Sequence, residues 1–218
     1  MNRQYMDRPQ TWAEELANSI SHGIGLLLAM GSMPVLVDFA ASRGRLVDMI
    51  GACVFSGTMI LVYAASATYH ALPEGKLKRL ANKLDHAAIF LFIAGSYTPF
   101  SLAGISGFWD WTIFGLVWTL AAVGVVLKAM GRLTNLWLST AFYIALGWLV
   151  MLALWPLMER LPEMSLGLLL GGSGAYTAGA VFFLLDSRVR YAHFVWHLFV
   201  IAGSTCHFLA ALRHVPLT

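Results

Sequence analysis

Long apolar stretches without an acidic or basic side chain alternate with short charged segments along the chain. A helix that crosses the hydrocarbon core of a bilayer needs about 17–25 predominantly apolar residues, and seven of these stretches have that length. The pattern therefore predicts an all-α integral membrane bundle of seven transmembrane helices that uses residues 1–218 as a single domain. The expected spans are approximately 16–38, 48–71, 84–107, 110–128, 134–157, 164–185 and 191–212.

The composition agrees with a membrane protein. Hydrophobic residues make up 59% of the chain and charged residues only 11%, with a mean hydropathy of +0.71. A soluble domain carries about a quarter charged residues. The first apolar stretch follows Glu14 and Glu15 rather than a basic segment and is long enough to span, so we expect no cleavable signal peptide. The expected location is the plasma or inner membrane of the cell.

The basic residues predict the orientation of the bundle. A net charge of +3 would suit nucleic-acid binding, but these residues lie in short segments between spans, so we expect no nucleic-acid partner. If the spans alternate, ten of the fourteen Lys and Arg residues fall on the side of the N-terminus and four on the other side. Cytoplasmic loops carry the excess of Lys and Arg. The N-terminus is therefore predicted to be cytoplasmic and the C-terminus outside, and a reporter fused after Thr218 should be active only outside.

Three histidines and an aspartate are expected at the cytoplasmic ends of their spans. His193 and His197 open the last span at positions i and i+4, which share one helical face. His70 ends the second span one turn after Ser66, and Asp85 begins the third. Alternation of the spans brings these groups to the same membrane side. Ionisable groups inside a membrane are costly and usually functional, so we expect a site there.

A further polar face lies at the start of the first span. Glu15, Asn18 and His22 are spaced i, i+3 and i+7, so they share one side of a helix at the same membrane end. We expect them to contribute to cofactor binding near the histidines. The alternative is an ordinary polar patch at the membrane interface.

Three neutral imidazoles suit Zn²⁺, and a site with three protein ligands leaves a fourth position for water. Zinc lowers the pKa of such a water to about 7. Asp85 is then a candidate to orient the water or accept its proton. Ser66 is a candidate to hydrogen-bond an imidazole or to help stabilise a developing oxyanion. The alternative for each histidine alone is a hydrogen-bonded interior residue. The His193–His197 pair lacks the glutamate of the His-Glu-x-x-His metalloprotease motif, and no Gly-x-Ser-x-Gly motif is present.

Four segments together resemble the hemolysin III proteins of bacteria, a branch of the progestin and adipoQ receptor (PAQR) family that includes the adiponectin receptors. The segments are residues 15–22, 66–70, 84–100 and 193–197, so the resemblance extends over nearly the whole chain. It implies seven transmembrane helices, a cytoplasmic N-terminus and a zinc ion near the cytoplasmic side.

By motif, the resemblance implies zinc ligands at His70, His193 and His197, with Asp85 holding a zinc-bound water and Ser66 close by. The adiponectin receptors and the alkaline ceramidases of the wider superfamily suggest hydrolysis of lipid amides. We therefore expect a zinc-dependent hydrolase of lipid amides or esters, with a membrane lipid as substrate or ligand. A non-enzymatic regulator of membrane lipid state with structural zinc is the alternative, and a cytolytic pore is a third hypothesis that these apolar spans do not explain.

Overall fold

The computed structural model describes residues 8–103, 108–153, 158–159 and 161–213, and this part of the chain is helical without strands. The predicted all-α class is therefore confirmed. Seven α-helices and one 3₁₀ helix are described: α1 (Trp12–Ala41), α2 (Leu46–Ala71), α3 (Lys76–Ala103), α4 (Phe108–Ala129), α5 (Leu136–Gly147), η1 (Trp148–Ala153), α7 (Glu163–Leu184) and α8 (Ala192–Arg213).

The bundle exposes large apolar side chains on its outer surface and buries several polar side chains within a mainly apolar interior. Large apolar side chains face outward along the helices, including Leu27 at 70% exposed and Val181 at 55%. Polar side chains such as Asn18 and Ser139 are completely buried. Contiguous exposed apolar surface on this scale is suited to lipid rather than water. Five of the helices are long and apolar enough to cross a membrane: α1, α2, α4, α7 and α8.

The third and fifth predicted spans differ from their helices. α3 begins at Lys76, eight residues before the expected start, because the basic segment continues the helix instead of forming a loop. α5 ends at Gly147 and continues as η1 to Ala153, since its last turns tighten to 3₁₀ geometry. The expected ends of these two spans, residues 104–107 and 154–157, lie outside the described residues.

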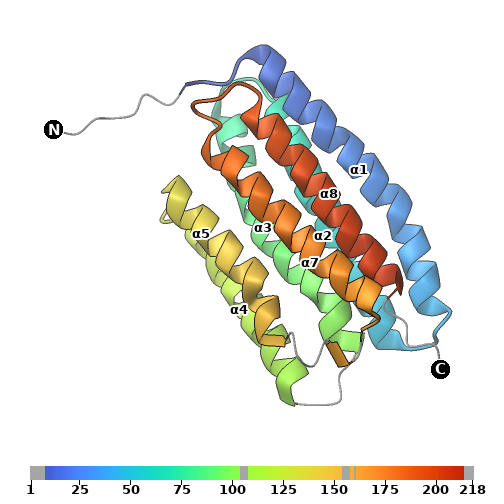
Figure 1. Ribbon diagram of the computed structural model, residues 1–218. Helices are drawn as coiled ribbons and strands as arrows, with labels where there is room; N and C mark the ends of the chain where they lie inside the picture. Colours follow the sequence, from blue (N-terminus) through green and yellow to red (C-terminus); the bar gives the residue numbers. More distant parts are fainter. Residues whose placement is uncertain (1–7, 104–107, 154–157, 160, 214–218) are drawn as a thin grey trace.

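Two apolar cores hold the bundle together, and α3 contributes to both. The larger core lies between α1, α2, α3, α7 and α8 and includes Phe55 and Leu169. The smaller core surrounds Phe90 of α3 and includes Val117 of α4 and Leu146 of α5. α4 packs mainly against α3, and α5 contacts α3, α4 and α7 (Figure 1).

The packing of α1, α2 and α8 determines where the three histidines lie. α1 packs against both α2 and α8, whereas α2 and α8 have only sparse backbone contact with each other in the described part of the chain. α1 begins, α2 ends and α8 begins at the same end of the bundle (Figure 1). The side of the membrane that this end faces remains a prediction.

Candidate metal centre

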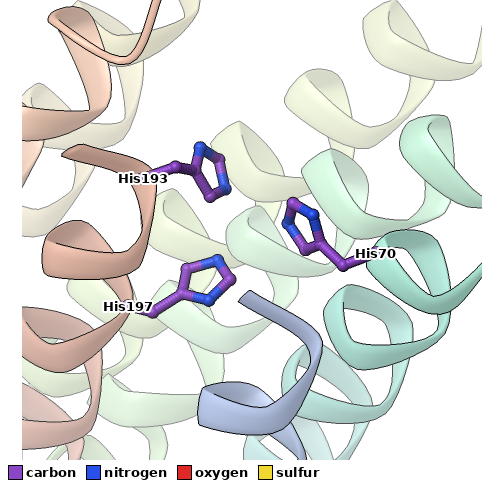
Figure 2. A group of neighbouring side chains, drawn as sticks. All are labelled: His70, His193 and His197. Carbon is purple, nitrogen blue, oxygen red and sulfur yellow. The ribbon is translucent and has the colours of Figure 1, made fainter. Parts of the chain in front are cut away.

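Three histidine side chains from two helices meet at this end of the bundle. His70 lies in the last turn of α2, and His193 and His197 lie in the first two turns of α8. One ring nitrogen of each lies within 4.8 Å of those of the other two. Figure 2 shows the three rings turned toward a shared space. No other group of this kind is found among the described residues.

The Nδ1 atom of each ring has a hydrogen-bond partner, which indicates that Nε2 is the nitrogen left to bind a metal ion. His70 Nδ1 lies 2.7 Å from Glu15 Oε2, and His193 Nδ1 lies 3.1 Å from Asp186 Oδ2. His197 Nδ1 lies 3.2 Å from the backbone carbonyl of Asn18. Carboxylate and carbonyl oxygens only accept hydrogen bonds, so each Nδ1 carries the proton and each Nε2 keeps its lone pair. Three Nε2 lone pairs are thus available to one ion.

This pattern fits a metal ion. Histidines that bind metals almost always donate their other N–H to a carboxylate or a backbone carbonyl, as all three do here. His70 Nε2 is buried and has no hydrogen-bond partner. A buried polar atom without a partner is unfavourable, and coordination would satisfy it. The donor set of three imidazoles without thiolates suits Zn²⁺ among other divalent transition metals.

α1 supplies side chains that contact the histidines. Glu15 bridges His70 and Lys78, because its Oε1 lies 2.9 Å from Lys78 Nζ. Ser21 Oγ lies 2.9 Å from His197 Nδ1, and the ring of His22 stacks on that of His197 with centroids 3.4 Å apart. The face predicted from Glu15, Asn18 and His22 therefore lies against the histidines. Neither Glu15 nor His22 belongs to the group of possible metal ligands found among the described residues.

Asp85 and Ser66 are buried next to the histidines. Asp85 in α3 is 7% exposed and Ser66 in α2 is 1% exposed. The Asp85 carboxyl lies beside Ser66 and within electrostatic reach of His193. Ser66 Oγ makes no hydrogen bond of ordinary geometry in the described structure. The Asp85 carboxyl and the Ser66 hydroxyl are therefore buried beside each other, with the carboxyl within electrostatic reach of His193.

Comparison with known proteins gives the family. Residues 10–208 match the family model described as Haemolysin-III related. The chain belongs to this family. The chain is similar to Hemolysin-3 of Bacillus cereus, 38% identical over 202 residues that cover 93% of this chain and 92% of the relative. It is also similar to the Hemolysin-3 homolog of Bacillus subtilis, 36% identical with 93% and 94% covered.

A more distant human relative also matches. The chain is 24% identical to the human monocyte to macrophage differentiation factor over 220 residues, which cover 94% of this chain and 86% of the relative. No solved structure matches this haemolysin-III protein. The predicted resemblance to hemolysin III is therefore confirmed over most of the chain.

Three supporting residues were not predicted from the sequence. Asp186 contacts His193, Ser21 contacts His197, and Glu14 joins the start of α1 to the start of α8. Glu14 accepts two hydrogen bonds from Arg8, at 2.7 and 2.6 Å, and one from the N–H of Tyr191 at 3.0 Å. Because Tyr191 immediately precedes α8 and has a left-handed backbone (φ 58°), this bond fixes the chain at the start of the helix that carries His193 and His197.

The charge pattern contained a signal for one of them. Asp186 is the first charged residue after the sixth apolar stretch and lies seven residues before His193. A carboxylate beside a ligand pair at the same membrane end is a natural partner for an imidazole N–H. The distance between them depends on the tight turn between α7 and α8, which spacing alone does not specify.

Replacing Asp186 with alanine is expected to weaken metal binding by about 10–100-fold, the usual effect of losing the partner of a metal-binding histidine. The His193 ring would lose the acceptor that holds its proton on Nδ1. The measurement is competition for the metal with a chromophoric chelator. Asp38→Ala, which removes an exposed carboxylate near the other end of α1, is the matched control. Equal affinity in the two variants would contradict a supporting role for Asp186.

Proposed function

We propose that this haemolysin-III family protein is a membrane-embedded hydrolase that binds Zn²⁺ through His70, His193 and His197 and cleaves a lipid amide or ester. The observation that carries the proposal is the group of three histidines with ring nitrogens within 4.8 Å of one another, together with the buried Asp85 carboxyl within electrostatic reach of His193. When bound, zinc would polarise the substrate carbonyl and make water nucleophilic at neutral pH.

Asp85 and Ser66 are assigned the proton and oxyanion roles. Asp85 would accept a proton from the attacking water as the water oxygen bonds to the carbonyl carbon. It would return that proton to the amide nitrogen or ester oxygen as the bond from carbon to this atom breaks. The Ser66 hydroxyl, which is buried beside the Asp85 carboxyl, would donate to the developing oxyanion. Water is consumed and no other co-reactant is needed.

A membrane lipid is the substrate class that this location supports. The helices around the site expose apolar side chains to the surroundings, so a molecule in the bilayer reaches the bundle from the side. The histidines lie at the ends of their helices, at the depth of lipid headgroups and the first carbonyl groups. Ceramide-like amides and acyl esters carry their scissile carbonyl at this depth.

The test is turnover by purified, zinc-loaded protein in lipid nanodiscs, with a panel of ceramides, N-acyl amines, phospholipids and acylglycerols analysed by mass spectrometry. Release of a fatty acid from one class is expected, with loss of release after chelation and recovery on adding Zn²⁺. The control is His207→Ala, because His207 lies deeper in α8 and bonds the carbonyl of Leu169 instead of facing the site. A panel left intact by metal-loaded protein would contradict the hydrolase.

A regulator of membrane lipid state with structural zinc is the second candidate. It is favoured by the sparse contact between α2 and α8, which a shared ion would join directly. Its signature would be a large fall in thermal stability on chelation without any turnover. A cytolytic role, which the names of the bacterial relatives suggest for those proteins, would instead require concentration-dependent dye release from liposomes.

A further inference from the structure

One lysine of the basic segment that begins α3 is buried. The segment carries four cations, of which Lys76, Arg79 and Lys83 are exposed, whereas Lys78 is only 6% exposed. Lysine is almost never buried in a protein unless its ammonium group is paired. The buried position follows from the early start of α3, because residue 78 lies in the first turn of this helix and its side chain reaches α1 and the end of α2.

Three contacts hold the ammonium group of Lys78. Its Nζ lies 2.9 Å from Glu15 Oε1 in α1 and 3.1 Å from the carbonyl oxygen of Leu72, the residue after α2. It also lies 4.9 Å from the centre of the Tyr69 ring, within the range of a cation–π contact. Lys78 therefore joins the first turn of α3 to the start of α1 and the end of α2.

Glu15 connects Lys78 to His70. The two carboxylate oxygens of Glu15 are divided between these groups, since Oε2 lies 2.7 Å from His70 Nδ1 while Oε1 contacts Lys78. A glutamate side chain has several rotatable bonds, and fixing it in one conformation costs about 1.5–2 kcal/mol of rotamer freedom. A carboxylate held at both oxygens is therefore better oriented toward His70 than one held at a single oxygen.

We infer that Lys78 is a positioning residue of the metal centre, which holds the Glu15 carboxylate in the orientation that accepts the Nδ1 proton of His70. Lys78 is not itself a ligand, because an ammonium group has no lone pair. The hydrogen-bond partner of a metal-binding histidine fixes its ring orientation and its tautomer. The inference rests on the proposed metal binding by the three histidines and is independent of hydrolysis.

The charge of Lys78 alone would have the opposite effect on metal binding. A cation repels a divalent metal ion nearby, so removal of a lysine that acts only by its charge would strengthen metal binding. Removal of a lysine that orients Glu15 would weaken metal binding instead. The sign of the change in affinity therefore separates the two roles.

The experiment is titration of the purified protein in detergent with Co²⁺, followed by the visible absorption of the bound ion, and with Zn²⁺ in competition with a chromophoric chelator. Lys78→Met is expected to weaken the binding of both metals about tenfold, near the lower limit for loss of a direct partner of a metal-binding histidine. It should also change the Co²⁺ spectrum. Lys78→Arg should recover most of the affinity, since a guanidinium also donates to a carboxylate. Lys76→Met, which removes an exposed cation of the same turn, should weaken neither metal.

A double variant tests whether Lys78 acts through Glu15. Glu15→Gln alone is expected to weaken Zn²⁺ binding by about 10–100-fold. Adding Lys78→Met to it should cause at most about a twofold further loss, because two residues that act through one contact are not additive. Losses that multiply in the double variant would overturn the inference, as would unchanged or tighter binding by Lys78→Met.

Two further measurements separate this inference from misfolding and from failure of the metal site itself. The Tm of Lys78→Met in the presence of a chelator should match that of metal-free wild-type protein. If it is lower, Lys78→Gln, which keeps a polar side chain without the charge, should show the same loss of affinity. Wild-type protein that binds neither metal would refute the proposed metal site and the inference with it. Metal binding by the wild type that is matched by both Lys78 variants would refute the inference alone.

Discussion

Alanine in place of His70 is expected to abolish stoichiometric metal binding by the purified protein. The structure leaves His70 Nε2 buried and unpartnered, facing the pair on α8. Loss of the hydrogen-bond partner of a metal-binding histidine weakens metal binding by about 10–100-fold. Loss of a residue that binds the metal directly should weaken it more. Elemental analysis after gel filtration should therefore show about one zinc ion per wild-type chain and almost none in the variant.

The same substitution separates a bridging ion from an ion held by α8 alone. Because a ligand that binds only the folded state stabilises it, chelation should lower the Tm of the wild-type protein. His70→Ala protein should already have the lower Tm and show no further change on chelation. His207→Ala serves as the control, since it removes a buried imidazole of α8 that bonds Leu169. Retention of stoichiometric zinc by His70→Ala would show that His70 is not a ligand.

The histidine pair in α8 was predictable because its geometry is local. Two residues four apart in a helix share a face in any helical protein, and the apolar stretch after His193 predicted the helix. Predicting that His70 lies near this pair required one more assumption, that successive spans cross the membrane in opposite directions. This alternation predicts the membrane side of His70 but not the residues that it contacts. The actual contact depends on α1 packing against both α2 and α8, and a sequence pattern does not specify that packing.

The carboxylates that contact the histidines show which parts of the site a sequence pattern does not specify. Glu15 was placed on the correct face of α1 by its spacing from Asn18, although its bond to His70 crosses between helices. Asp186 was overlooked because its approach to His193 depends on the turn before α8, including the left-handed conformation of Tyr191. The start of α3 was misplaced for a different reason. Charged residues were expected to end the helix, but a membrane helix can extend beyond the apolar region into water.

Asparagine in place of Asp85 is expected to reduce hydrolysis by about 10²–10⁴-fold, the usual contribution of a general base. The amide has nearly the same shape as the carboxyl group but does not accept the proton of the attacking water. Because Asp85 is not among the three residues whose ligand atoms lie within 4.8 Å, the metal content should stay at the wild-type level. The measurement is kcat on the lipid class identified by the panel, with elemental analysis of the same sample.

Two comparisons determine whether the effect of Asp85→Asn is chemical. Asp38→Asn replaces an exposed carboxyl near the other end of α1 and should retain full activity. Asp85→Glu keeps a proton acceptor on a longer side chain and should recover part of the lost kcat, which a purely structural role would not predict. If Asp85→Asn loses zinc together with activity, Asp85 acts in metal binding. If it keeps both, the proton is accepted elsewhere, and the buried carboxyl beside Ser66 has a structural role.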